Sequence, residues 1–513
     1  MSLSDSNSRK IGVILSYILL AVQAIIGLLY VPLLLNILGK NEYGLYQLMG
    51  SLVAYFSVMD FGLSASIVRY YSKYQATKDK ENMENVLGLA QRLYFVISII
   101  LFILAFIFYF LIDPMFKNSL TVYEIMESKK IYMCLIFNVL ITLLTNIHTA
   151  VITANEKFIF LKSISIIQQL IQPFVVVLVI TKSPKALNVV LVQTCLNLIL
   201  GLSKVMYMKY KLKIKAVFHS LDKTLIRGMI RLSLSVFIVT LVDQIFWKSN
   251  QFILGVISGT SAVALYSVAA QIYMNYMPFS STIQGIFLPH ITKRISLGAD
   301  DHEISNLFIK IGRIQYLILG LVLFGFIVYG KSFITLWTGK DYIDAYYIAL
   351  LIMIPFTIDL IENTGLAIMQ AKNIYGYRAK LYGSIAILNI LLSITFGKVY
   401  GALGCAIATS IAMFLGNGIA MNIFYIKKLK IDILSFFKNI GRISIAPLIT
   451  SIICVMVKMF LNTNSWLYLF INIMIFVFFY IILTYMISLN KYEKNLIRGI
   501  FIKLNPKKAY ADE

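Results

Sequence analysis

The chain has 513 residues, of which 59% are hydrophobic and 13% are charged, whereas a soluble protein usually carries about 25% charged residues. This composition excludes an ordinary soluble enzyme and predicts a chain embedded in lipid. The 46 Lys and Arg residues outnumber the 23 Asp and Glu residues, but they occur in short clusters between apolar stretches. They build no continuous phosphate-binding face, which argues against nucleic acid as a partner.

The apolar stretches between these clusters have the length of membrane-spanning helices, because about 20 mainly apolar residues cross about 30 Å of hydrocarbon. The first stretch is longer than the apolar region of a signal peptide and has no small-residue cleavage site after it, so we expect it to be retained as a span. We predict fourteen spans, at residues 11–38, 45–68, 93–112, 131–154, 163–181, 186–203, 232–257, 262–290, 314–330, 346–371, 381–397, 402–426, 443–461 and 466–489.

The distribution of basic residues predicts the orientation of these spans. If the N-terminus is cytoplasmic, 35 basic residues lie in or beside cytoplasmic segments and nine lie in outer loops. This asymmetry follows the positive-inside rule, and an even number of spans then places both termini in the cytoplasm. The outer loops are short, so we expect no outer catalytic domain.

Two features divide the chain into halves. Gly39 with Leu45-Tyr46 recurs as Gly259 with Leu265-Tyr266 at an offset of 220, which relates spans one and two to spans seven and eight as parallel repeats. The longest inner connection, residues 204–231, carries eight basic residues and is expected to contact anionic headgroups. We predict an N-terminal lobe at 1–210, a basic cytoplasmic linker at 211–231, a C-terminal lobe at 232–430, spans thirteen and fourteen at 431–490, and a cytoplasmic tail at 491–513.

Enzyme motifs are scarce in this sequence. The stretch from Gly325 to Ser332 matches the P-loop pattern G-x-x-x-x-G-K-S. A phosphate-binding loop needs a strand before it, a helix after it and cytoplasmic nucleotide, whereas this stretch is the apolar outer end of span nine. We interpret the match as a coincidence. The four cysteines have no metal-ligand spacing, and we expect no catalytic residue, no metal and no cofactor.

Span seven holds the densest polar cluster of any predicted span: Asp243, Gln244, Lys248 and Asn250 lie within two helical turns. An ionisable residue at the centre of a spanning helix costs about 2.5–3.5 kcal/mol, so such residues usually face a cavity or a partner. Gln244 and Lys248 are four residues apart and share one helix face. Two interpretations stay open for Lys248: it contacts an anionic substrate group in a cavity, or it pairs with an acid on another helix.

Span ten contains two acids, Asp359 and Glu362, close to Pro355 and Gly365. The acids are three residues apart and share a face of a helix that proline and glycine can bend. This arrangement suits coupling to H⁺ or Na⁺. The alternative is a structural pair that burial neutralises or a basic residue matches.

Span two contains Asp60, and Arg69 lies at the inner end of the same span. The two residues are candidates for the cytoplasmic mouth of a cavity. Arg69 is equally explained as a positive-inside anchor.

Four segments resemble the Wzx-type polysaccharide flippases of the multidrug/oligosaccharidyl-lipid/polysaccharide exporter superfamily, and their order extends the likeness over most of the chain. They are PLLLNILGKNEYGLYQLMGSLVAYFSVMDFGLSASIVRYYSKYQ, GTSAVALYSVAAQIYMNYMPFSSTIQGIFLPHITK, ITLWTGKDYIDAYYIALLIMIPFTIDLIENTGLAIMQAKNIYGYRAK and YGALGCAIATSIAMFLGNGIAMNIFY. The resemblance implies an all-α polytopic membrane protein in which two six-helix lobes surround a central cavity and two C-terminal helices follow.

The resemblance also implies alternating access and a substrate of undecaprenyl-pyrophosphate-linked sugars. Many members of the family have a cation-lined cavity. This sequence departs from that pattern, because Lys248 is its one convincing mid-span cation and the spans hold four acids. Arg69 and Arg231, at the inner ends of spans, are further candidates for the pyrophosphate contact.

We therefore expect a flippase of the bacterial plasma membrane, coupled to an H⁺ or Na⁺ gradient and making no covalent change. Its expected partners are membrane lipid, the polyprenyl-linked oligosaccharide and other polysaccharide-assembly membrane proteins, and the expected state is a monomer. Two alternatives stay open. One is a multidrug or cation antiporter of the same superfamily, which the intramembrane acids favour. The other is a membrane polysaccharide polymerase, which should carry a catalytic acid or an Arg-rich site in a sizeable outer loop.

Overall fold

The computed structural model describes residues 3–495 except 221, 373, 375 and 462. Its described residues form helices and connecting turns, with no β-strand among them. The chain divides into two compact units. The first comprises Met1–Val268 and Tyr382–Ala408, and the second comprises Ala269–Leu381 and Thr409–Glu513. Most of the predicted tail at 491–513 lies outside the described residues, and the predicted lobe boundaries stay a prediction.

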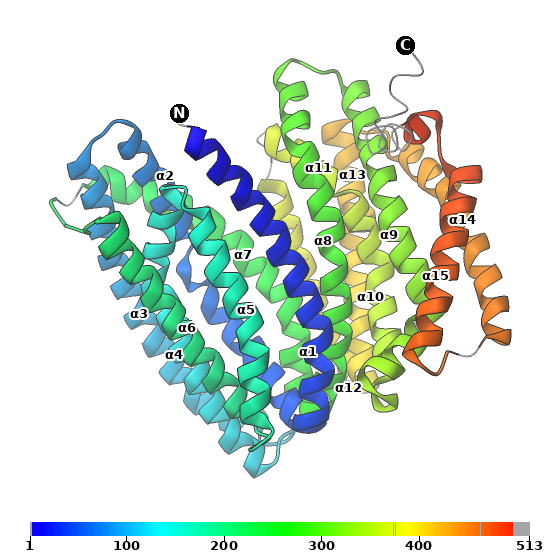
Figure 1. The fold of residues 1–513 in the computed structure, drawn as a ribbon, viewed down its shortest axis with the longest axis horizontal. Helices are drawn as coiled ribbons and strands as arrows, with labels where there is room; N and C mark the ends of the chain where they lie inside the picture. Colours follow the sequence, from blue (N-terminus) through cyan, green and yellow to red (C-terminus); the bar gives the residue numbers. More distant parts are fainter. Residues whose placement is uncertain (1–2, 221, 373, 375, 462, 496–513) are drawn as a thin grey trace. The chain divides into compact units, whose positions relative to one another are not determined.

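The helices follow one another along the chain from blue to red in Figure 1. The first unit contains α1 (Leu3–Ser57), η1 (Val58–Asp60), α2 (Leu63–Ala76), α3 (Lys80–Phe116), α4 (Val122–Ala154), α5 (Phe158–Ile180), α6 (Ala186–Met206), η2 (Tyr207–Leu212), α7 (Lys223–Ser258), the start of α8 (Thr260–Ser296) and most of α12 (Gly376–Met413). The second unit contains the rest of α8, α9 (Asp301–Thr338), η3 (Lys340–Tyr342), α10 (Asp344–Ile361), α11 (Asn363–Ala371), η4 (Phe414–Met421), α13 (Asn422–Phe424), η5 (Tyr425–Leu429), α14 (Ile433–Phe460), α15 (Trp466–Leu483) and η6 (Thr484–Ser488).

The number of long apolar helices agrees with a polytopic membrane protein. Within the described residues, eleven helical segments are long and apolar enough to cross a membrane. Two of them, Ile11–Ala76 and Tyr377–Leu429, contain a glycine with non-helical dihedral angles, Gly39 and Gly401, and so comprise more than one straight stretch. The helix α8 is a further long element of 37 residues. The predicted fold class is confirmed, and the fourteen predicted spans are consistent with these helices.

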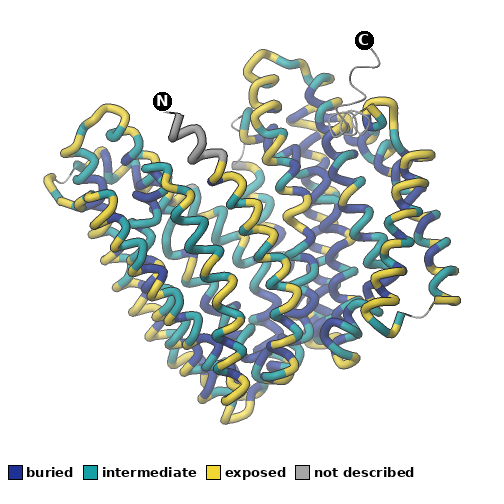
Figure 2. The backbone as a smooth tube through the Cα atoms, viewed as in Figure 1, coloured by how far each residue is buried: buried dark blue, intermediate teal, exposed yellow. Residues whose placement is uncertain are grey.

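The outer faces of the helices are apolar. On α3, the side chains of Phe95, Phe102 and Phe110 are each more than half exposed. Figure 2 shows such exposed residues recurring along the length of the helices, beside buried ones. Exposure of these apolar faces to water would be unfavourable in free energy, whereas contact with lipid tails carries no such penalty.

Aspartates outside the spans mark where helices begin. Asp79 accepts hydrogen bonds from the side chain and backbone of Asn82 at the start of α3. Asp222 accepts from the hydroxyl of Thr224 and the backbone N–H of Leu225 at the start of α7. These hydrogen bonds, first those from the side chains, hold the pKa of both carboxyls below the usual range. Both carboxylates are therefore charged at neutral pH. Each interacts favourably with the positive, N-terminal end of the helix dipole that it caps.

The connection between η2 and α7 is anchored on α3. Asn85 Oδ1 accepts the backbone N–H of His219 at 3.1 Å, and the guanidinium of Arg92 lies 3.3 Å from the centroid of the Phe218 ring. A Cβ at Gly88 would come within 2.6 Å of the backbone of this connection. Because α7 begins at Lys223, the predicted linker at 211–231 includes the first turns of a helix. Its contact with anionic headgroups stays a prediction.

The two glycines of the predicted repeat adopt the same backbone conformation. Gly39 has φ 77° and ψ 175°, and Gly259 has φ 77° and ψ −173°. A positive φ of this kind is accessible mainly to glycine. Each glycine separates two helical stretches, so the repeated residue marks a repeated turn.

Small residues allow close approach between α1–α2 and α7–α8 in the first unit. Near one end, a Cβ at Gly44 would lie 2.0 Å from the carbonyl oxygen of Thr260. Beside this contact, the hydroxyl of Ser261 donates to Asn41 Oδ1 at 2.8 Å. Further along, a Cβ at Gly255 would lie 2.2 Å from a methyl of Leu48.

The close approach continues toward the other end of the same helices. A Cβ at Gly62 would lie 2.6 Å from Val236 Cβ, and the hydroxyls of Ser66 and Ser233 are 2.9 Å apart. We call the line of Gly44, Gly62, Ser66, Ser233 and Gly255 the glycine–serine seam. Small residues at such contacts let helix backbones approach closely, which is how helices associate when lipid removes the hydrophobic driving force.

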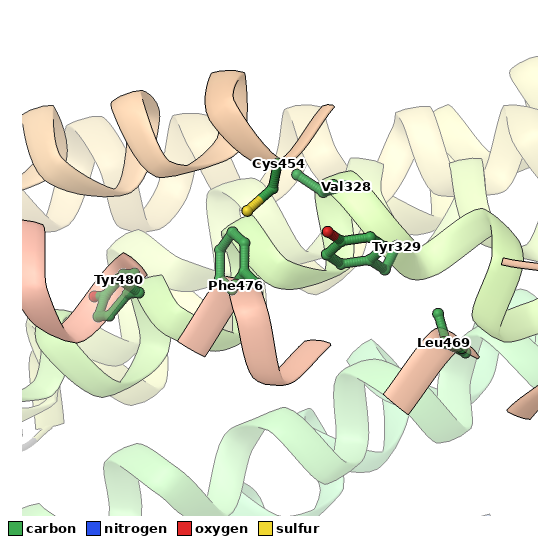
Figure 3. Packing of buried hydrophobic residues seen from close by; sticks show 6 residues of the cluster. All are labelled: Val328, Tyr329, Cys454, Leu469, Phe476 and Tyr480. Carbon is green, nitrogen blue, oxygen red and sulfur yellow. The ribbon is translucent and has the colours of Figure 1, made fainter. Parts of the chain in front are cut away.

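In the second unit, α14 and α15 pack against α9. Figure 3 shows the buried cluster that joins them, with Val328 and Tyr329 on α9, Cys454 on α14, and Leu469, Phe476 and Tyr480 on α15. The hydroxyl of Tyr480 donates to the carbonyl oxygen of Leu317 on α9 at 2.7 Å. The last two long helices are therefore fixed to this unit.

A buried ion pair ties the end of the described chain to α9. Arg313 Nε lies 2.6 Å from Glu493 Oε1, and Arg313 donates a second hydrogen bond to Glu493 Oε2 at 2.8 Å. The two side chains are 5% and 4% exposed. The same guanidinium donates to Asn439 Oδ1 and to the carbonyl oxygen of Ser488. Such paired hydrogen bonds fix both the distance and the relative orientation of the guanidinium and the carboxylate.

Replacing Gly44 by Ala is expected to lower the thermal unfolding midpoint of the detergent-solubilised protein. The new methyl collides with a backbone carbonyl, so the seam must open. Gly50→Ala is the matched control, because nothing lies within 4 Å of a Cβ at that position on the same helix. Equal midpoints for the two variants would contradict the structural role of the seam.

Replacing Arg313 by Met is expected to destabilise the protein by about 3–5 kcal/mol, because it leaves the buried Glu493 without its partner. The control is Arg294→Met, which removes an exposed pair with Glu303 and should cost at most about 1 kcal/mol. Thermal unfolding followed by fluorescence measures both. A small loss for Arg313→Met would mean that the pair contributes little.

Candidate functional site

Asp60 lies at a break in the second predicted span, where three elements supply hydrogen-bond donors. The 3₁₀ turn η1 ends at Asp60, and Phe61 and Gly62 have positive φ before α2 begins. Asp60 Oδ1 accepts from the hydroxyl of Tyr94 on α3 at 2.7 Å, from Asn146 Nδ2 on α4 at 2.9 Å and from Ser64 Oγ at 3.0 Å. Neutral side chains from three elements thus supply the hydrogen-bond donors of this carboxyl group.

Arg69 does not join this cluster. It is exposed on α2, and the described residues provide no ion pair between Arg69 and Asp60. The joint role predicted for them at a cavity mouth stays a prediction. The donors Tyr94 and Asn146 lie in predicted spans three and four, and no sequence pattern pairs them with Asp60.

The polar residues of span seven divide between two faces of α7. Gln244 and Lys248 are half-buried on one face, and Asp243 is exposed. Among the described residues, no hydrogen bond or ion pair of Lys248 is found. Of the two interpretations that stayed open for Lys248, the pairing with an acid therefore lacks a described partner. Its contact with a substrate anion stays a prediction.

Asn250 belongs to the opposite, packed face of α7. It is 1% exposed, its Nδ2 donates to the hydroxyl of Tyr266 at 2.7 Å, and its Oδ1 accepts from Ser393 Oγ at 2.8 Å. Ser393 also donates to Asn389. The amide of Asn250 thus joins α7, α8 and α12 of the first unit, and its predicted contact with substrate stays untested.

An apolar cavity of about 460 Å³ lies beside this network within the first unit. Residues of α1, α3, α7 and α12 line it, among them Phe56, Phe108 and Ser249. Ser249 follows Lys248 in α7, so a cationic side chain and an apolar space occur on adjacent residues of one helix. This combination is compatible with a ligand that has a charged part and an apolar part.

In the second unit, the helix of span ten breaks at Glu362. The sequence predicted that Pro355 and Gly365 can bend this helix, and the break lies between them: Pro355 is inside α10, and Glu362, with φ −89° and ψ 0°, separates α10 from α11. Glu362 is 2% exposed and accepts a hydrogen bond from Asn422 Nδ2 at 2.9 Å. Gly365 instead provides close packing, because a Cβ there would lie 2.5 Å from the ring of Tyr425.

Neighbouring helices satisfy the polar groups of this break. The hydroxyl of Ser280 on α8 donates to the carbonyl oxygen of Leu360 at 2.6 Å, and Gln315 on α9 donates to Ser280 at 3.2 Å. Broken helices in lipid need such partners for the backbone groups that the break frees. Asp359, on the last turn of α10, is half-buried. A buried carboxyl at a helix break suits cation coupling, which stays a prediction for Asp359 and Glu362.

The P-loop-like stretch from Gly325 to Ser332 lies within α9, which is helical from Asp301 to Thr338. A phosphate-binding loop requires non-helical backbone whose N–H groups converge on the ligand. The backbone N–H groups of this stretch are used within the helix. The interpretation of this match as a coincidence agrees with the structure.

A line of polar residues on α4 was missed by the sequence analysis. Asn138, Thr142 and Asn146 recur every four residues in span four, so they share one face of the helix. That spacing is the signal that could have revealed it. These side chains are neutral, whereas most of the other candidate residues of the spans stand out by their charge.

Sequence comparison places the chain in a family. Residues 9–293 match the family model described as "Polysaccharide biosynthesis protein". The chain belongs to this polysaccharide biosynthesis protein family. The resemblance found in the sequence is thereby confirmed at the level of the family. No curated protein matched the sequence.

Solved structures share the fold of this polysaccharide biosynthesis family member. "Lipid II flippase MurJ, inward closed conformation" is 17% identical with a TM-score of 0.74, and the match covers 95% of this chain and 99% of that chain. An inward-facing multidrug resistance MATE family transporter of the MOP superfamily is 12% identical with a TM-score of 0.64, over 80% of this chain and 98% of that one. The MATE multidrug transporter DinF-BH is 14% identical with a TM-score of 0.58, over 82% and 95%. The protein is thus a multi-pass membrane protein with the fold of flippases and transporters.

Proposed function

We propose that this protein is a flippase that moves an undecaprenyl-pyrophosphate-linked oligosaccharide from the inner to the outer leaflet of the bacterial plasma membrane, for surface polysaccharide biosynthesis. The observation that carries the proposal is Lys248. It is a cation within a spanning helix of a polysaccharide biosynthesis family member, and the described residues offer it no carboxylate. An anionic headgroup such as pyrophosphate would supply the missing partner.

The physical task fits a chain made of spanning helices. A polyprenyl tail stays in lipid throughout transport, but a charged, sugar-bearing headgroup needs a polar path across the hydrocarbon. Intramembrane polar groups on packed helices provide such a path. An inside-negative potential favours outward movement of an anion by about 2.3 kcal/mol per charge per 100 mV, so nucleotide hydrolysis is not required.

The placement of basic residues supports cytoplasmic termini and therefore an inner-leaflet loading side. We also infer coupling to H⁺ or Na⁺ through Glu362 and Asp359. The buried carboxyl of Glu362 beside the amide of Asn422 is a group whose charge a bound cation or proton would neutralise.

A second candidate function is a multidrug or cation antiporter. The carboxyls of Asp60 and Glu362 within spanning helices favour it, because acids attract cationic substrates. The fold of the chain, which is similar to that of MATE transporters, is compatible with this alternative. The transport assay below separates the two functions when a cationic dye replaces the lipid-linked sugar.

Proteoliposomes holding a fluorescent undecaprenyl-pyrophosphate-linked sugar in the inner leaflet are expected to expose it outside when the protein is present. Lys248→Ala should slow this transport at least about tenfold while protein abundance and thermal stability stay unchanged, because the headgroup loses its cation. Lys331→Ala is the control, since that exposed lysine contacts Tyr347 at a helix end. Wild-type transport by Lys248→Ala would refute the role of Lys248, and dye transport without lipid transport would favour the antiporter.

Glu362→Gln is expected to make transport insensitive to an imposed pH or sodium gradient, because the isosteric amide retains the shape but loses the charge. Initial rates with and without each gradient measure the effect. Glu303→Gln, at an exposed helix start, should respond like the wild type. A Glu362→Gln variant that still follows the gradient would exclude this residue from coupling.

A further inference from the structure

A small open cavity, mostly apolar but with polar side chains on its α4 side, lies between α1 and α4 in the first unit. Its volume is about 250 Å³. The α1 side is lined by small residues that include Gly50, Ala54 and Ser57, and the α4 side by Asn138, Thr142 and Asn146, together with neighbouring apolar residues. The small side chains of α1 leave room for the cavity. The amides of Asn138 and Asn146 and the hydroxyl of Thr142 provide polar groups in its wall.

The polar groups of α4 are held in place from both sides. Asn197 on α6 donates its amide to Thr142 Oγ1 at 3.0 Å and also hydrogen-bonds to Asn138 Oδ1. Asn146 donates to Asp60 at 2.9 Å. These bonds fix the orientation of the α4 side chains without using all their hydrogen-bonding capacity, because the described residues give no partner to Asn138 Nδ2 or Asn146 Oδ1.

Unused amide groups are costly in a spanning helix. A polar atom without a hydrogen-bond partner is unfavourable in hydrocarbon, and these two atoms are available to hydrogen-bonding groups that enter the cavity. The cavity offers a donor, Asn138 Nδ2, and an acceptor, Asn146 Oδ1, two helical turns apart. A hydroxyl group both donates and accepts a hydrogen bond, so a polyol matches this arrangement.

The cavity carries no free charge. Its lining residues are uncharged, and Asp60, which does not line it, accepts hydrogen bonds from Tyr94, Asn146 and Ser64. A pyrophosphate therefore has no cation to bind here, in contrast to the α7 face that carries Lys248. The volume is below the range of about 300–1,000 Å³ typical of sites for drug-sized ligands, which suits one sugar ring and excludes a whole repeat unit.

We propose that this cavity is a sugar-binding subsite in which Asn138, Thr142 and Asn146 bind the hydroxyl groups of one residue of the transported oligosaccharide. The assignment rests on the proposed flippase function and adds the part of the chain that recognises the sugar. Neutral amides hold the sugar loosely enough for release, because each hydrogen bond to the sugar replaces one to water and gains little net free energy.

The test compares two probes on purified, detergent-solubilised full-length protein: undecaprenyl pyrophosphate carrying one N-acetylglucosamine, and undecaprenyl pyrophosphate without sugar. The wild type is expected to bind the sugar-bearing lipid about tenfold more tightly. Asn138→Leu and Thr142→Val should reduce this ratio to near one and leave the affinity for the sugar-free lipid unchanged. Thr149→Val is the matched control, because Thr149 lies on the same helix and does not line the cavity.

The outcomes separate this inference from the proposed function. If the wild type binds neither lipid, the flippase function fails and the subsite falls with it. If both lipids bind and the cavity variants keep the wild-type ratio, or if the wild type itself shows no preference, the subsite is refuted and the flippase function stands. Thr142→Val is nearly isosteric, so it gives an answer even if Asn138→Leu does not fold.

Discussion

Close packing of helix backbones at the glycine–serine seam is the contact on which the first unit depends. In lipid, apolar side chains gain nothing by leaving the solvent, so helices associate through van der Waals contact and hydrogen bonds. The contacts of Gly44 with Thr260 and of Ser66 with Ser233 supply both. They hold α1–α2 against α7–α8, and Asp60 lies at the break between α1 and α2, whereas Lys248 lies on α7. A larger residue in the seam would therefore displace the residues of the candidate site.

The cost of a polar group in hydrocarbon explains the remaining polar arrangement. Glu362 has the amide of Asn422, Arg313 has Glu493, and Asp60 has three neutral donors. Each pair crosses between helices, so the same bonds that satisfy these groups also fix the packing. Other described polar groups have no such partner, and among them are Lys248 and the amide atoms Asn138 Nδ2 and Asn146 Oδ1. Lys248 lies on a cationic face of α7, whereas Asn138 and Asn146 line a neutral cavity.

Sequence patterns revealed different parts of the site to different extents. Charge within an apolar stretch identified Lys248, Asp60 and Glu362 directly, because ionisable residues are rare in spanning helices. The neutral stripe of α4 was visible as a four-residue spacing and was overlooked. Residues that are close in the sequence need not share a role. Asn250 lies two residues from Lys248, yet it faces the opposite side of α7 and takes part in hydrogen bonds between packed helices.

The sequence by itself determined the spanning helices, the positions of their breaks at Gly39 and Gly259, and the family, because apolar length and glycine at positive φ are local properties. It did not determine which residues meet. The partners of Asp60 lie 34 and 86 residues away, and Arg313 lies 180 residues from Glu493. Only tertiary packing decides such contacts, because each apolar helix can present several faces to its neighbours, and close backbone approach selects one of them.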